Sequence, residues 1–99
     1  MAINKIQMYK TQLESMRQSL TNESDSNKSN HVSQPIADRF NLFLNKITEA
    51  HPEAAEFLPP PITTSRHHKI MAISDATYLD LGLLLDDTIK VLSEIERHA

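Results

Sequence analysis

The stretch "DATYLDLGLLLDDTIKVLSEIER", residues 75–97, carries the clearest structural pattern in the chain. Its core-type residues recur at intervals of three and four, the spacing of one face of an α-helix. The members of this row are Leu81, Leu84, Thr88, Val91 and Ile95. Leu85 and Leu92 widen the apolar face, and Ser74 or Asp75 is suited to cap the helix. We therefore predict a long helix over 75–97 that packs against two neighbours at the centre of the fold.

Gly82, the only glycine of the chain, lies inside this predicted helix. A glycine in a helix interior costs about 1 kcal/mol relative to alanine. We interpret Gly82 as a point where another helix approaches too closely for a side chain to fit. The scarcity of glycine also argues against β-hairpins and nucleotide-binding loops, which depend on its backbone freedom. Composition therefore favours helices joined by polar or proline-containing loops.

A second helical pattern covers residues 3–20, where apolar residues occupy heptad positions a and d. We call this row the N-terminal stripe; its members are Ile6, Tyr9, Leu13, Met16 and Leu20. An isolated helix of about five turns is marginal in water, so this one must dock. It packs either on its own chain or on a second copy. The stripe is thus a core or dimer seam, or a surface that binds a partner protein.

Residues 21–34 are rich in Ser and Asn, and Val32 is their only large aliphatic residue. Such a composition buries too little apolar surface to offset the entropy lost on ordering. We predict a flexible polar linker that lets the first helix dock in cis or in trans. The expected organisation is an amphipathic helix over 1–20, a linker over 21–34 and a helical core domain over 35–99.

Prolines set the limits of the helices in the middle of the chain. A helix should begin near Pro35, because proline suits the first helical turn. Its apolar face is formed by Ile36, Phe40, Phe43, Leu44 and Ile47. Pro52 should end or kink it, with further helical turns over 52–58, and Pro59–Pro61 should stop them. The following "KIMAIS", residues 69–74, is either a short extended piece or the first turns of the last helix.

The bulk composition bounds the size and assembly of the fold. The chain has 99 residues, of which 39% are hydrophobic, and it has no cysteine. Disulfides and thiolate metal sites are therefore excluded, and oligomerisation is the leading candidate for supporting a small core. We predict an all-α fold, a small helical bundle of three to four helices completed by homodimerisation, with a flexible polar linker after the first helix.

Charge is distributed unevenly along the chain. Residues 1–20 carry three basic residues against Glu14, a net of +2, whereas residues 74–99 carry six acids against Lys90 and Arg97, a net of −4. Opposite signs favour contact between the first and last helices, within one chain or between two.

Residue patterns for catalysis or metal binding are absent from the sequence. There is no cysteine, no glycine-flanked serine elbow and no glycine-rich phosphate loop. The five histidines lack the H-x-x-x-H spacing of a metal site on a helix. Asp80, Asp87 and Glu94 are interpreted as the solvated face of the last helix. We predict that the protein is not an enzyme and uses no cofactor or metal.

The only basic cluster is Arg66, His67, His68 and Lys69. Affinity for nucleic acid grows with the number of phosphates that are neutralised. Two permanent charges are few, and the formal charge of the chain is −3, so nucleic acid is not the favoured partner. A weak nucleic-acid-binding regulator using this loop is the alternative hypothesis.

The favoured hypothesis is a small adaptor, regulator or inhibitor. No run of 18 apolar residues is present to span a membrane, and the N-terminus lacks the apolar core of a signal peptide, so we expect a cytoplasmic protein. We expect it to bind a partner protein without catalysis, by burying the apolar stripe of a helix in a groove.

Overall fold

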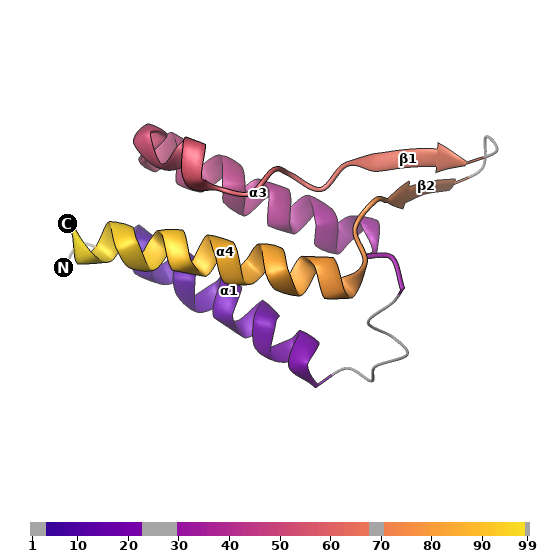
Figure 1. Cartoon of the computed structure of the whole chain (residues 1–99), viewed down its shortest axis with the longest axis horizontal. Helices are drawn as coiled ribbons and strands as arrows, with labels where there is room; N and C mark the ends of the chain where they lie inside the picture. Colours follow the sequence, from indigo (N-terminus) through magenta and orange to yellow (C-terminus); the bar gives the residue numbers. More distant parts are fainter. Residues whose placement is uncertain (1–3, 23–29, 68–70, 99) are drawn as a thin grey trace.

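The computed structural model describes residues 4–22, 30–67 and 71–98. In this part of the chain, three α-helices form a bundle that carries a short 3₁₀-helix and a two-stranded hairpin (Figure 1). The elements are α1 (Lys5–Thr21), α3 (Gln34–Ala50), η1 (Pro52–Phe57), β1 (Thr64–His67), β2 (Met71–Ser74) and α4 (Tyr78–Arg97). The predicted class, a small all-α bundle, is confirmed, and the hairpin is an addition to it.

Helix α4 is central, as its wide apolar face predicts. It packs along α1 on one side and contacts η1 on another (Figure 1). The helix begins at Tyr78 rather than at residue 75, because Thr77 is its N-cap. The Thr77 side chain accepts a hydrogen bond from the Asp80 amide at 3.2 Å, and the Asp80 carboxylate accepts one from the Thr77 amide at 3.0 Å. This capping box satisfies two amides that the helix itself leaves unpaired.

The predicted cap at Ser74 or Asp75 is therefore wrong. Ser74 is the last residue of β2 and is buried, and its hydroxyl donates to the carbonyl of Val32 at 2.5 Å. Asp75 accepts a hydrogen bond from the Thr63 hydroxyl instead. Both side chains are thus committed to tertiary contacts that a pattern within one helix does not contain.

Helix α1 packs on its own chain. Ile6, Leu13 and Leu20 of the N-terminal stripe are buried in the same core as the leucines of α4. The two helices run antiparallel and are joined by two ion pairs: Lys10 Nζ lies 3.4 Å from Glu96 Oε1, and Arg17 Nε lies 2.9 Å from Asp86 Oδ1. The predicted attraction between the first and last helices is confirmed within one chain.

Residues 64–67 and 71–74, between the triple proline and α4, are extended, so the described part of residues 69–74 is a strand and not the start of the last helix. β1 and β2 pair antiparallel from Thr64↔Ser74 to His67↔Met71. The approach to β1 is held by Asn41, whose side chain accepts from the Ile62 amide at 2.8 Å and donates to the Ile62 carbonyl at 3.0 Å. The expectation that a chain so poor in glycine forms no hairpin is wrong.

The last residues of the predicted linker have fixed partners. Val32 is buried, and its amide donates to the Ala76 carbonyl at 2.9 Å. The Tyr78 amide donates to the Asn30 carbonyl at 3.0 Å. These bonds tie the entry of α3 to the start of α4. The earlier part of the linker, residues 23–29, lies outside the described residues.

Gly82 does not mark a close approach of helix backbones. A Cβ built at this position would meet the Arg17 guanidinium at 3.5–3.8 Å, which is ordinary van der Waals contact. The earlier interpretation of Gly82 is therefore wrong, because the nearest neighbour is the end of a flexible side chain.

We predict that Gly82→Ala raises the free energy of unfolding by about 1 kcal/mol, since alanine restricts the unfolded chain and favours helix. Urea denaturation followed by circular dichroism measures the change. A lower midpoint than that of the parent protein would show that the Arg17 side chain has no room to move.

Candidate functional site

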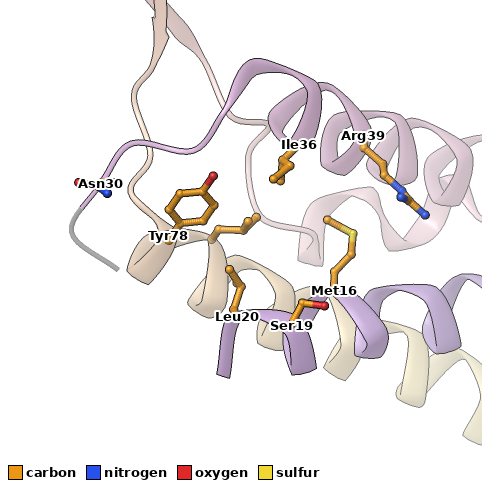
Figure 2. Close-up of a pocket in the computed structure, with 8 residues that line it drawn as sticks. Met16, Ser19, Leu20, Asn30, Ile36, Arg39 and Tyr78 are labelled. Carbon is orange, nitrogen blue, oxygen red and sulfur yellow. The ribbon is translucent and has the colours of Figure 1, made fainter. Parts of the chain in front are cut away.

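Two hollows that share no lining residue lie between the elements of the fold. The first, which we call the α1–α3 cleft, has a volume of about 450 Å³. It is lined by Met16, Ser19 and Leu20 of α1, Ile36 and Arg39 of α3, and Tyr78 and Leu81 of α4, together with Asn30 (Figure 2). Asn30 alone comes from the segment that precedes α3. Three helices therefore contribute apolar walls to one cleft.

The side chains converge on the cleft from different elements. Figure 2 shows Met16 pointing up from α1 and Ile36 pointing down from α3, with the ring of Tyr78 closing one side. The Tyr78 hydroxyl accepts a hydrogen bond from the Ser33 amide at 3.4 Å. This bond holds the ring against the chain that leads into α3.

An aromatic contact joins α1 to α3 beside the cleft. The rings of Tyr9 and Phe43 meet edge to face, with centroids 6.1 Å apart and planes at 70°. The Arg39 guanidinium carbon lies 5.9 Å from the centroid of the Phe43 ring, within reach of a cation–π attraction. Arg39 is exposed, and among the described residues it is the only charged one that lines the cleft. The cleft is thus apolar, with a positive charge at its edge.

The second hollow, which we call the η1–α4 groove, has a volume of about 750 Å³. Its apolar surface comes from Ala54 and Phe57 of η1 and from Val91 and Ile95 of α4. Phe57 is 68% exposed, the highest value among the large hydrophobic residues described as exposed. The remaining lining residues are His51, Glu53, Asp87, Lys90, Glu94 and His98.

Ion pairs organise the charged rim of this groove. His51 Nδ1 lies 3.2 Å from Glu53 Oε1, and Glu94 is 3.3 Å from Arg97 and 3.5 Å from His98. A backbone hydrogen bond, and then the hydrogen bond from His51, lower the pKa of Glu53 below its ordinary value of 4.5. Glu53 therefore stays ionised at neutral pH. Among the described lining residues, the three acids Glu53, Asp87 and Glu94 outnumber the one lysine, Lys90.

The five residues of the N-terminal stripe have different environments. Ile6, Leu13 and Leu20 are buried, whereas Tyr9 and Met16 are partly buried. Met16 and Leu20 alone line the α1–α3 cleft. Most of the stripe is therefore core, and its C-terminal end is the part that borders a hollow.

The basic cluster is described only in part. Arg66 and His67 belong to β1, in the hairpin that extends away from the helices (Figure 1). His68 and Lys69 lie outside the described residues.

The η1–α4 groove was missed by sequence reasoning. The helical pattern of α4 assigned Asp87 and Glu94 to a solvated face, which is where they lie, but it does not reveal what faces them. The available signal was Phe57, an aromatic residue two positions before the proline run and outside any helical stripe.

No protein-family model, curated protein or solved structure matches the chain. Within the described ranges, no group of three or more His, Cys, Asp or Glu residues is placed to hold a metal ion. None of the helices described is both long and apolar enough to cross a bilayer.

Proposed function

We propose that the protein is a small non-catalytic adaptor that binds a partner protein in the α1–α3 cleft. The observation that supports this proposal is a cleft with apolar walls from three helices that are fixed to one another. Its volume of about 450 Å³ falls within the range of about 300–1,000 Å³ that is typical of ligand sites. Apolar anchors that fill such hollows supply most of the binding energy of protein interfaces.

The charge at the edge of the cleft indicates the chemistry of the partner. Arg39 is the only charged residue among the described ones that line the cleft, and Lys46 lies seven positions later on the same side of α3. Residues of this sign attract carboxylates and repel cations. The occupant that fits is an amphipathic helix with apolar anchors beside Asp or Glu residues.

Site-specific photo-crosslinking in the native host tests this proposal. A photo-reactive amino acid replaces Ser19, which is exposed at the rim of the cleft, and in a control it replaces the exposed Asn45 of α3. We expect position 19, but not position 45, to capture a discrete protein. Adding Arg39→Glu should reduce that capture at least tenfold, whereas Asn45→Glu should leave it unchanged. Equal capture from both positions, or capture that is insensitive to Arg39→Glu, would contradict the proposal.

Homodimerisation and a cytoplasmic location stay predictions of the same proposal. Because Ile6, Leu13 and Leu20 are buried in their own chain, a second copy would have to contact other apolar residues. Leu79 and Leu83 are each 61% exposed and lie one turn apart on α4. Sedimentation velocity of the parent chain and of Leu83→Ser measures whether this pair supports a dimer.

A weak nucleic-acid-binding regulator is the second candidate. The observation in its favour is the hairpin, which extends beyond the helices and carries Arg66 and His67 in β1 (Figure 1). A two-stranded ribbon can enter the major groove of DNA. A salt-sensitive gel shift that Arg66→Ala weakens would support this candidate, and no shift of the parent protein at low salt would end it.

A further inference from the structure

We infer that the η1–α4 groove is a second docking site, which takes a basic amphipathic helix of a protein partner. The groove is lined by residues from η1 and from the C-terminal half of α4, and by the cap residues His51 and His98. None of these residues lines the α1–α3 cleft. The inference therefore goes beyond the proposed function and can hold or fail separately from it.

The apolar surface of the groove supplies the anchor points. Ala54 is buried at its base, Val91 and Ile95 are partly buried on the α4 wall, and Phe57 is 68% exposed on the η1 wall. Phe57 is held in place because η1 ends there, where the Leu58 amide donates to the Ala55 carbonyl at 3.4 Å. Aromatic residues presented on a fixed backbone are frequent energetic centres of protein interfaces.

The charges of the rim select a basic occupant. Three acids, Glu53, Asp87 and Glu94, line the groove against one lysine, Lys90. Asp87 and Glu94 are seven residues apart, so they are displaced by about 10.5 Å along the axis of α4 at about 1.5 Å per residue. A helix lying along α4 would bring its own residues at the same interval opposite these two carboxylates. An occupant with Lys or Arg at that spacing and apolar residues towards Phe57 satisfies both features.

Two histidines stand where the cations of such a helix would bind. His51 pairs with Glu53 on the η1 wall, and His98 pairs with Glu94 on the α4 wall. Lysine or arginine carries a permanent charge and forms stronger pairs with carboxylates than neutral imidazole does. A basic helix can therefore take the place of His51 at Glu53 and of His98 at Glu94, and Glu94 keeps its pair with Arg97 at 3.3 Å.

Peptide titration into the full chain tests the inference. The probe is an 18-residue helical peptide of Leu and Lys, with leucines on one face, and its matched control replaces every Lys by Glu. Affinity is measured by fluorescence anisotropy, and ¹⁵N chemical shifts locate the site. We expect the Lys peptide to bind at least tenfold more tightly than the Glu peptide and to shift the amides of Phe57, Val91 and Ile95.

Variants of the chain make the result specific. The double variant Asp87→Lys with Glu94→Lys should weaken binding of the Lys peptide at least tenfold, because it removes two carboxylates of the rim. Phe57→Ser should have an effect of the same size, because it removes the apolar anchor. These side chains are exposed or at the rim, so the fold should tolerate the changes. The matched controls change exposed residues of α3. Asp38→Lys with Glu49→Lys matches the double charge reversal, and Leu42→Ser matches Phe57→Ser. Both controls should leave the affinity unchanged.

Three outcomes would overturn the inference. These are equal binding of the two peptides, affinity that is insensitive to the groove variants, and chemical shifts that map to the α1–α3 cleft. Arg39→Glu separates the two sites, because it should reduce crosslinking from position 19 at least tenfold and leave binding of the Lys peptide unchanged.

Discussion

Removal of residues 1–22 is expected to unfold the rest of the chain at 25 °C. The deletion takes away Ile6, Leu13 and Leu20, which are buried in the common core, and exposes the leucines of α4 beneath them. Burial of one large aliphatic side chain contributes about 1.5–3 kcal/mol. Domains of ordinary stability unfold with a total of about 5–15 kcal/mol. The deletion therefore removes the burial energy of the α1 side chains and of the α4 leucines that they cover, which is most or all of the net free energy of unfolding.

Far-UV circular dichroism and the dispersion of methyl NMR signals measure this outcome. Addition of a peptide of residues 1–22 is the matched control, and it should restore helicity and dispersion to the truncated chain. A truncated chain that keeps a cooperative thermal transition would show that α1 is dispensable for the core.

Phe40→Ala is expected to lower the free energy of unfolding by about 3–5 kcal/mol. Phe40 is completely buried in the middle of α3, and truncation of a buried aromatic ring loses its transfer free energy and leaves a cavity. Urea denaturation measures the change as a lower midpoint at constant slope.

The neighbouring Leu42→Ala provides the control for this effect. Leu42 is 54% exposed two positions later on the same helix. Its truncation should change the free energy of unfolding by only about 0.5 kcal/mol, as is usual for surface sites. Similar losses of unfolding free energy at Phe40 and Leu42 would mean that α3 does not bury the face that contains Phe40.

Helix periodicity predicted the bundle because each long helix buries one continuous face. The face of α3 that contains Phe40 and Ile47, and the face of α4 that contains Leu85 and Leu92, follow directly from the spacing of apolar residues. Periodicity could not decide between cis and trans docking of α1. A heptad stripe has the same spacing whether it meets its own chain or another copy.

The hairpin and the true cap of α4 depend on contacts between distant residues. Asn41 fixes Ile62, and Ser74 bonds to Val32, so each partner is far away in the sequence. Neither strand has the strict alternation of apolar and polar residues by which a strand is predicted from sequence. Local patterns therefore gave a cap at Ser74 or Asp75, whereas the folded chain uses Thr77.

The candidate sites were only partly within reach of the sequence. The N-terminal stripe was recognised, and its members Met16 and Leu20 do border the α1–α3 cleft. The groove required Phe57 of η1 to face Val91 and Ile95 of α4. A pattern within one helix carries no information about what packs opposite it.

Docking of α1 on its own chain is the premise of the account, because only that arrangement brings Met16 and Leu20 of the same chain into the α1–α3 cleft. The contact between Tyr9 and Phe43, with ring centroids 6.1 Å apart, reports it directly. Labelled and unlabelled chains are unfolded together, refolded as an equal mixture and examined by isotope-filtered NOE spectroscopy. We predict a ring-to-ring NOE between Tyr9 and Phe43 within one chain and none between chains. An NOE between the rings of different chains would show a swapped α1 and contradict the account.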